Sequence, residues 1–490
     1  MRLAVTLPIA SVIAITFPQI PEPGARPPDC LYASGPRCGK LYRIVRIAPD
    51  VVDRRPWRGL RHDKMQGRSR LDRREFLSGA AGLGLVSLAS VSAPPLAWAQ
   101  ERSGLKITGI RLVKTRSRLP RIDAPPRPGI WSGQGSEVAN PMSIYPEYKP
   151  KRSLFSAEGV TGFVVEITTD KGITGLGTGG PGGGPIVTGH LAKLLMGRDP
   201  FDIERNWDIC WRSTMNYSGF GGPVMNAISG VDLALWDIVG KALGVPVYKL
   251  LGGNVRDRIP AYATGNDIEY NAKLGFKMLK LAIPHGPASG RAGMRENVAL
   301  VERARKAVGP DGEVMLDCWM AWTEDYTVEI CKMLEPHRVY WVEEVLRPYD
   351  YEGFGRLNAQ ISSTRIATGE HEYSRFGFRR LLQVNGADIW QPDIQWCGGM
   401  TELRRIGALA QTYDIPVIPH GGGNNAARHW SIANVNAPMV EFFQPAPAGT
   451  KEAVRQFETL YSITYGPEGV YSRPPETPGM GWDMEVVGAA

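Results

Sequence analysis

Short apolar runs recur along residues 314–420, and each of them ends in an acidic residue or a histidine. The residues that end the runs are 26, 27, 23 and 27 positions apart, and the intervening segments have the apolar spacing of helices. Strands that alternate with helices at this regular interval are typical of parallel βαβ winding. The sequence therefore predicts an α/β fold built on a (β/α) barrel. The five run-ending residues are Asp317, Glu343, Glu370, Asp393 and His420.

Residues that follow successive parallel strands are expected to meet at one end of the barrel, where (β/α) barrels carry their catalytic groups. A solvated strand-end acid is the alternative interpretation of any one position. Three consecutive strands ending in Asp317, Glu343 and Glu370 favour a common site instead. Three carboxylates at one point are hard oxygen ligands, which suit Mg²⁺ better than a metal that prefers sulfur.

The region before the barrel has an α+β pattern. Its glycine-rich segment, Gly175–Gly184, is expected to be a surface loop, because no Gly-Lys-Ser/Thr motif supports a phosphate site. The predicted division is 100–255 for the α+β domain, 256–444 for the barrel, and 445–490 for a segment that returns to the first domain. The strands and helices predicted in the α+β domain are Lys106–Val113, Gly162–Thr168, Val187–Met196, Ile203–Ser213 and Met225–Leu243.

The formal net charge of +8 comes entirely from the first 99 residues. They contain 15 Lys and Arg and 7 Asp and Glu, so that 42 basic and 42 acidic residues remain in the rest of the chain. A formally neutral body lacks the basic surface that binds phosphate backbones. We therefore expect no nucleic-acid partner.

Residues 65–99 have the composition and order of an export signal. Arg73 and Arg74 lie in a segment that resembles the twin-arginine motif, an apolar stretch follows, and Ala97-Trp98-Ala99 matches a small-residue cleavage signal. These features predict export to the periplasm by the twin-arginine route. The apolar stretch is rich in Gly and Ser, so no lasting membrane span is expected.

The segment before this signal, residues 1–64, is expected to be upstream of the true start or disordered. Export signals stand at the N-terminus of a protein, and Met65 precedes the arginine pair. An apolar segment at residues 3–17 that acts as a separate anchor is the alternative.

Several motifs, in order along residues 105–480, carry a family resemblance. They are Asn140–Ser143, Val231–Asp237, Tyr248–Gly253, Met315–Met320, Gly369–His371, Gln391–Asp393, Trp396–Gly399 and Pro419–Gly421. On these motifs the chain resembles the enolase superfamily, in its mandelate racemase and muconate lactonizing branch, and within that branch the L-rhamnonate dehydratase family. The resemblance implies a modified TIM-type barrel with an N-terminal α+β capping domain.

The resemblance also implies the roles of the strand-end residues. Asp317, Glu343 and Glu370 would hold Mg²⁺, which binds the carboxylate of a sugar acid and stabilises the enediolate formed when the α-proton leaves. Enzymes of this superfamily use a Lys or His base beside Mg²⁺. His420 is the candidate base, and Asp393 is placed to bind its other ring nitrogen.

The residues of the second barrel strand distinguish dehydratases from racemases in this family. Relatives that racemise or epimerise carry Lys-x-Lys there, whereas here Lys280 is followed by Leu281 and Ala282. A single histidine that takes the C2 proton and returns it to a departing C3 hydroxyl fits dehydration. Lys280 would then bind the substrate carboxylate or the enediolate; a strand-end lysine in solvent is the alternative.

Three further positions follow from the resemblance. Glu441, at the end of the eighth strand, would act electrostatically near the metal, while Arg152 and His371 would contact the substrate. The alternatives are an ordinary strand-end acid for Glu441, a solvated surface arginine for Arg152, and for His371 a residue that only supports the groups of the pocket. One departure concerns the capping segment 131–138, which contains no histidine although the family carries one there. The identity of the sugar acid therefore stays open.

The sequence thus predicts a Mg²⁺-dependent acid-sugar dehydratase, a hydro-lyase with a small-molecule substrate. A cycloisomerase or epimerase of a related acid sugar is the first alternative. A periplasmic binding protein that has lost turnover is the second, although all five strand-end residues are present. The resemblance further implies a homo-oligomer.

Overall fold

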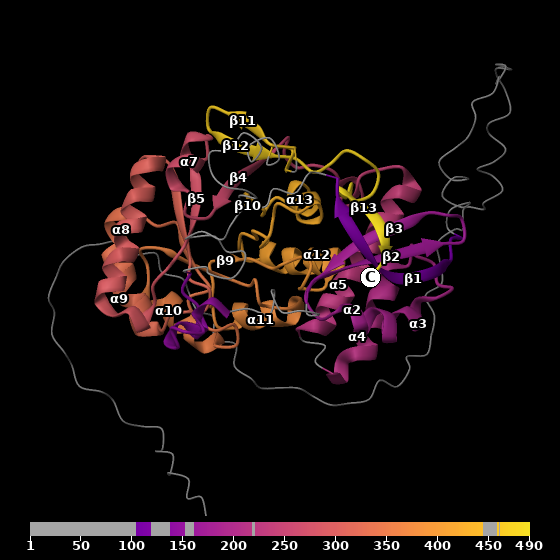
Figure 1. The fold of residues 1–490 in the computed structure, drawn as a ribbon, viewed down its shortest axis with the longest axis horizontal. Helices are drawn as coiled ribbons and strands as arrows, with labels where there is room; N and C mark the ends of the chain where they lie inside the picture. The colour runs from indigo at the N-terminus through magenta and orange to yellow at the C-terminus, as the bar shows by residue number, and fades with distance from the viewer. Residues whose placement is uncertain (1–103, 119–137, 152–160, 218–220, 444–457, 460) are drawn as a thin grey trace, which may run out of the picture. The chain divides into compact units, whose positions relative to one another are not determined.

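The structure is a computed structural model of the 490-residue chain (Figure 1). The twin-arginine-like segment, Arg152 and most of the capping segment 131–138 lie outside the residues that it describes. The described residues are 104–118, 138–151, 161–217, 221–443, 458–459 and 461–490.

A four-stranded antiparallel sheet begins the fold, with the strand order β13-β1-β2-β3. Its edge strand β13 comes from the end of the chain and pairs with β1. A turn at residues 170–172 joins β2 to β3, and Gly172 has a φ of +78° there, which suits glycine. The strands are β1 (Ile107–Ser117), β2 (Phe163–Thr169), β3 (Thr174–Gly179) and β13 (Met484–Ala489).

The first half of the glycine-rich segment, residues 175–179, belongs to strand β3, so the prediction of a surface loop was wrong there. Helix α5 (Pro223–Leu243) packs directly on β3, and its backbone comes very close. A Cβ at Gly175 would overlap the carbonyl oxygen of Ala234, and one at Gly177 would overlap that of Gly230. The glycines therefore permit helix–sheet contact, which a sequence pattern alone does not distinguish from a flexible loop.

Seven strands of the second sheet form the wall of a barrel. Strands β4 to β9 are neighbours in sequence order, and every adjacent pair is parallel. Strand β10 closes the other side by pairing in parallel with β4. These strands are β4 (Ile259–Thr264), β5 (Met278–Ala282), β6 (Glu313–Asp317), β7 (Trp341–Glu343), β8 (Arg365–Thr368), β9 (Ile389–Trp390) and β10 (Val440–Phe443).

Residues 416–418 occupy the remaining position in the wall, between β9 and β10. Trp390 donates its N–H to Pro416 O (3.0 Å) and accepts the N–H of Ile418 (2.8 Å), the pattern of a parallel neighbour. On the other side, Gly421 donates its N–H to the side chain of Glu441 on β10 (2.9 Å). Eight wall segments are thus arranged in chain order, and the predicted barrel is confirmed.

Helices follow the barrel strands on the outside, as Figure 1 shows for α8, α9 and α10. The barrel helices are α7 (Ile268–Lys273), α8 (Gly290–Val308), α9 (Glu324–Leu334), α10 (Tyr351–Gln360), α11 (Ser374–Gln383), α12 (Gly399–Gln411) and α13 (Asn425–Ile432). The helices before the barrel, besides α5, are α2 (Gly184–Ile186), α3 (Ala192–Leu195), α4 (Ile203–Thr214) and α6 (Val247–Leu250).

The α+β layer and the barrel share one apolar core, which includes α5 and α12. At this contact Thr401 donates two hydrogen bonds to the buried carboxylate of Asp232, one of them from its N–H (2.9 Å). A separate hairpin of β11 (Thr464–Gly466) and β12 (Gly469–Ser472) extends the barrel sheet beside β4.

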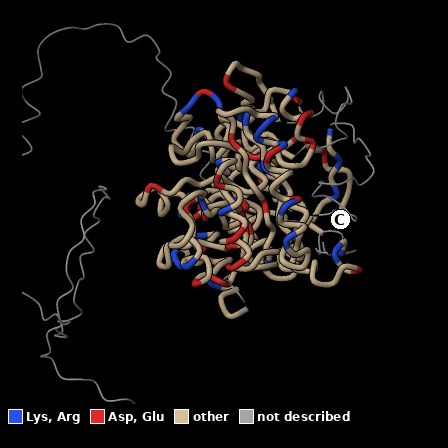
Figure 2. Tube along the Cα trace, turned by 90° about the vertical axis from the view of Figure 1, so that its left-hand side faces the viewer, with Lys and Arg blue, Asp and Glu red and all other residues tan. Residues whose placement is uncertain are grey.

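The charged positions of the described chain are interspersed, with blue and red segments alternating along the trace in Figure 2. Within the described residues, no helix is both long enough and apolar enough to cross a membrane.

Candidate active site

Most of the predicted site residues lie at or just after the carboxyl ends of barrel strands, whereas Lys280 and Glu441 lie within β5 and β10. Asp317 is the last residue of β6 and Glu343 the last of β7, and the two are partners in the parallel register. Glu370 follows β8 after Gly369, whose φ of +128° is rarely adopted by residues with a Cβ. The three acids, which follow three neighbouring strands, thus lie at one end of the barrel.

Asp317, Glu343 and Glu370 form one buried cluster, in which one oxygen from each carboxylate lies within 4.8 Å of the others. Burial, followed by the charge of Glu343, raises the pKa of Asp317 well above its usual range. Burial also raises the pKa of Glu370 to about 7. Three buried carboxylates side by side are therefore costly to ionise without a positive partner. Hard oxygen donors in this arrangement fit a divalent cation such as Mg²⁺.

The carboxylate of Glu343 is fully buried and held by three side-chain donors. Trp341 Nε1 (3.0 Å) and Gln391 Nε2 (2.6 Å) both donate to its Oε2, and Lys280 Nζ donates to its Oε1 (2.7 Å). Trp341 lies two residues before Glu343 on β7, so both point to the inside of the barrel. The orientation of this acid is thus set by the protein itself.

Lys280, on β5, is only 1% exposed and places its ammonium group among acids. Its Nζ lies 2.8 Å from Glu441 Oε1 and 3.2 Å from Asp317 Oδ2. Burial alone would lower the pKa of Lys280, but the neighbouring acids outweigh it and raise this pKa well above its usual value. The residue is therefore a buried cation, and the alternative of a solvated lysine does not apply.

Glu441, at the second position of β10, is also fully buried. Its carboxylate accepts hydrogen bonds from Thr264 Oγ1 (2.6 Å) and from the N–H of Gly421 (2.9 Å). Burial would raise the pKa of Glu441, yet the charges of Lys280 and His420 lower it below its usual value. Glu441 is thus an ionised acid beside the cluster, anchored by groups that are not part of it.

His420 lies between Asp393 and the acid cluster. Its Nδ1 lies 2.7 Å from Asp393 Oδ2, and its Nε2 lies 3.1 Å from Glu370 Oε1. The N–H of Gln395 donates to the other oxygen of Asp393 (2.6 Å), which fixes that carboxylate. Burial alone would lower the pKa of His420. The negative charges of Glu370 and then Asp393 have the larger effect and raise this pKa to about 10. The imidazole edge that carries Nε2 therefore faces the acids.

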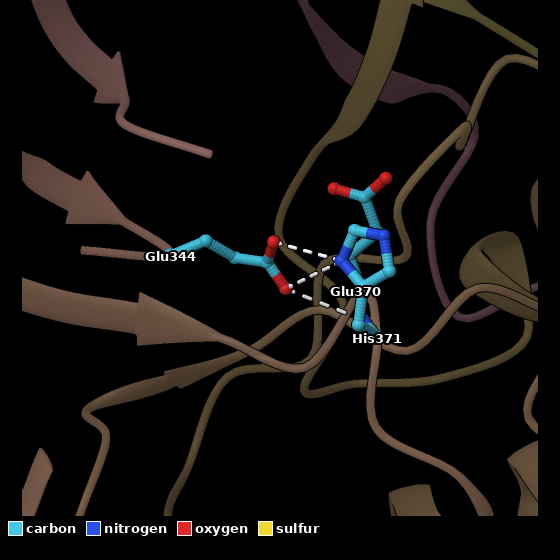
Figure 3. Close-up of side chains that lie close together, drawn as sticks. All are labelled: Glu344, Glu370 and His371. Carbon is cyan, nitrogen blue, oxygen red and sulfur yellow. Dashed lines mark hydrogen bonds and ion pairs between the residues drawn. The ribbon is translucent and has the colours of Figure 1, made fainter. Parts of the chain in front are cut away.

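His371 contacts Glu344, as Figure 3 shows, and a ring nitrogen of His371 lies within 4.8 Å of a carboxylate oxygen of Glu344 and of one of Glu370. Its Nδ1 lies 2.8 Å and 3.1 Å from the two oxygens of Glu344. Burial alone would lower the pKa of His371 as well. The negative charge of Glu344 has the larger effect, and the pKa of His371 is raised to about 9. Consecutive strand residues normally face opposite sides, but Glu344 has a φ of +46° just after β7, a conformation rare for a residue with a Cβ.

Aromatic rings pack against both histidines. The ring of Trp396 lies 5.4 Å from that of His420 and 5.5 Å from that of His371, measured between centroids. Trp319 lies 6.2 Å from His371, and Phe443 lies 6.3 Å from His420. Rings at these distances restrict the orientations open to each imidazole.

Several groups of this site were not assigned a role from the sequence. They are Trp341, Gln391 and Thr264, which bind the buried acids, and Trp396, which packs on the histidines. The spacing could have indicated two of them, because Gln391 precedes Asp393 by two residues, as Trp341 precedes Glu343. Thr264 and Trp396 have no such signal.

Two family profiles match the chain. The profile described as mandelate racemase / muconate lactonizing enzyme, N-terminal domain, matches residues 148–252. The profile described as enolase C-terminal domain-like matches residues 266–486.

The chain aligns with three relatives over most of the length of each. An L-rhamnonate dehydratase of Saccharopolyspora erythraea is 42% identical over 347 residues, which are 70% of this chain and 88% of the relative. The structure of rhamnonate dehydratase from Gibberella zeae complexed with Mg is 33% identical, with a TM-score of 0.68, and the match covers 78% of this chain and 94% of that one. The 3,6-anhydro-D-galactonate cycloisomerase of Zobellia galactanivorans is 29% identical, with a TM-score of 0.58, over 78% of this chain and 97% of that one. The chain therefore belongs to the mandelate racemase / muconate lactonizing enzyme family of the enolase superfamily.

Proposed function

We propose that the protein is a Mg²⁺-dependent acid-sugar dehydratase, which converts a 2,3-dihydroxy acid into a 2-keto-3-deoxy acid. The observation that carries the proposal is the position of His420, which contacts Asp393 with one ring nitrogen and Glu370 of the acid cluster with the other. The relatives named L-rhamnonate dehydratase and rhamnonate dehydratase support this activity, and L-rhamnonate is the first substrate to test.

Asp317, Glu343 and Glu370 are the residues that would hold Mg²⁺, because their oxygens converge in a buried, electron-rich cluster. The bound ion would supply positive charge to the substrate carboxylate and to the enediolate oxygens that become negative when the C2 proton leaves. The Gibberella zeae relative complexed with Mg supports this choice of ion.

His420 carries both proton transfers. A cation held by the cluster would offset the charge of Glu370, which does most to raise the pKa of His420, so the neutral ring is the form that takes the C2 proton through Nε2. The electron pair of the broken C–H bond moves into the enediolate. Asp393 stays bound to Nδ1, so the ring keeps its orientation and its positive charge is stabilised. His420 then returns the proton to the C3 hydroxyl, the C3–O bond breaks, and water leaves. The enol that remains tautomerises to the 2-keto-3-deoxy acid.

The other predicted positions act around this step. Lys280 and Glu441 form an ion pair beside the cluster. The positive charge of Lys280, which also contacts Glu343, would stabilise the negative charge of the enediolate or of the substrate carboxylate. His371, charged by its contact with Glu344, would bind the substrate carboxylate or a hydroxyl group. Arg152 is proposed to contact the substrate from the capping domain on the strength of its motif alone.

A screen of acid sugars with Mg²⁺, monitored by the formation of 2-keto acid, tests the proposed function. We expect turnover of L-rhamnonate or a stereochemically related sugar acid, and loss of turnover when EDTA removes the metal. Exchange of the C2 hydrogen with solvent deuterium without water loss would identify an epimerase instead. Isomerisation of an anhydro sugar acid would identify a cycloisomerase, and binding without any reaction would identify a binding protein.

We also propose that the enzyme is exported to the periplasm. The support is the order of the arginine pair, the apolar stretch and the Ala97-Trp98-Ala99 signal in the sequence. Replacing Arg73 and Arg74 together with lysine should leave the full-length precursor inside the cell. Equal periplasmic amounts of variant and wild type in cell fractions would contradict this route.

A further inference from the structure

Lys280 contacts acids on three different barrel strands. Its Nζ lies 2.7 Å from Glu343 Oε1, 2.8 Å from Glu441 Oε1 and 3.2 Å from Asp317 Oδ2. Glu343 and Asp317 are proposed ligands of Mg²⁺, whereas Glu441 is outside the ligand set. The same ammonium group therefore lies beside two of the carboxylates that would hold the metal.

The position of this cation has a physical reason in the metal-free protein. Buried carboxylates that lie close together repel one another and lack the solvation of water. Lys280 lies within ion-pair distance of both Asp317 and Glu343, and its side chain is 1% exposed, so it supplies compensation that solvent does not. Two positive groups beside the same carboxylates repel each other, so Lys280 and a bound divalent ion compete for Asp317 and Glu343.

Glu441 gives Lys280 a partner that does not depend on the metal. Its carboxylate is fixed by Thr264 and by the N–H of Gly421, and neither contact involves the acid cluster. The Lys280–Glu441 contact (2.8 Å) is almost as short as the Lys280–Glu343 contact (2.7 Å) and shorter than the Lys280–Asp317 contact (3.2 Å). The ammonium group can thus move away from the cluster and keep one full ion pair.

We propose that Lys280 is an internal counter-ion of the metal site, which shields Asp317 and Glu343 in the metal-free protein and withdraws toward Glu441 when Mg²⁺ binds. This role rests on the proposed function, because it takes these acids as Mg²⁺ ligands. Lys280 accordingly weakens Mg²⁺ binding and stabilises the metal-free fold.

Calorimetric titration with Mg²⁺ alone, without substrate, tests the sign of this effect. Lys280→Gln removes the competing charge, so the variant should bind Mg²⁺ about tenfold more tightly than the wild type. Its thermal unfolding temperature should be lower than that of the wild type in EDTA, and the difference should shrink in saturating Mg²⁺. Lys277→Gln is the matched control, since Lys277 is exposed on the opposite side of the same chain segment and should change neither quantity.

Equal or weaker Mg²⁺ binding by Lys280→Gln, with Lys277→Gln like the wild type, would overturn the inference while leaving the metal site in place. If the wild type itself binds no Mg²⁺, the proposed function fails instead. Should Lys280→Gln not fold, crystal structures of the wild type with and without Mg²⁺ decide the question. Nζ should stay with Glu441 and lie farther from Asp317 and Glu343 when Mg²⁺ is bound; unchanged contacts to all three acids would contradict the inference.

Discussion

Replacing His420 with asparagine removes the group that is proposed to move both protons. General acid–base catalysis by a positioned side chain contributes about 10²- to 10⁴-fold per step, and no ionisable group remains at this position in the variant. We therefore expect kcat to fall by about 10³-fold or more, which corresponds to about 4 kcal/mol in activation free energy.

The structure indicates that this loss will be chemical rather than structural. The amide of asparagine can still donate to Asp393, and the three acids of the cluster are untouched. Thermal unfolding of His420→Asn should therefore stay close to that of the wild type, and its Mg²⁺ affinity should not fall, because the variant loses a positive group beside Glu370 and none of the ligand acids. His190→Asn is the matched control, because His190 is exposed and lies outside the barrel site, and it should keep full activity.

Steady-state rates of 2-keto acid formation at saturating Mg²⁺ supply the measurement. A fall in kcat of less than about tenfold in a folded, Mg²⁺-binding His420→Asn variant would show that another group moves the proton. The role of His420 as the base would then be wrong.

The remaining predictions concern single groups. Burial raises the pKa of Asp232 from 3.8 to about 7. The folded protein therefore binds this proton more tightly than the unfolded chain does. This contribution to the unfolding free energy is complete below about pH 4 and is lost as the pH rises through about 7. Asp232→Asn should therefore gain up to about 4 kcal/mol of unfolding free energy relative to the wild type between pH 4 and pH 7.5, whereas a pH-independent difference would contradict this. Gly177→Ala should lower the unfolding free energy by about 3 kcal/mol in denaturant titrations, because its Cβ would overlap the carbonyl oxygen of Gly230; unchanged stability would refute the close contact. Gln391→Leu removes a donor from Glu343 and should weaken Mg²⁺ binding about tenfold in calorimetry, and equal affinity would show that Gln391 does not orient this acid.

The strand-end residues could be predicted from sequence because parallel strands leave little freedom in where their ends lie. A regular interval between apolar runs indicates βαβ units, and the ends of neighbouring parallel strands necessarily share one edge. Asp317, Glu343 and Glu370 therefore had to be close if each ended a strand. The same reasoning placed Asp393 and His420 on adjacent wall segments, where their side chains form a hydrogen bond.

The partners of these residues could not be predicted, because they depend on backbone angles and on side chains from distant segments. The family resemblance implies that Glu344 lies beside the metal ligands, but neither its positive φ nor its contact with His371 follows from strand alternation, which alone would turn it away from the site. The contact of Lys280 with acids of three strands depends on the closed wall of the barrel. The interpretation of Gly177 as part of a loop failed for a related reason, since the approach of α5 is a tertiary contact.

The most direct test of the account is the reaction of L-rhamnonate with the purified enzyme in deuterium oxide, followed by nuclear magnetic resonance with and without Mg²⁺. We expect a 2-keto-3-deoxy acid that carries solvent deuterium at C3, formed only when Mg²⁺ is present, and formed about 10³-fold or more slowly by His420→Asn. Product formation that persists in EDTA, or deuterium entering C2 of unreacted substrate while no water is lost, would contradict a metal-dependent dehydration with His420 as its base.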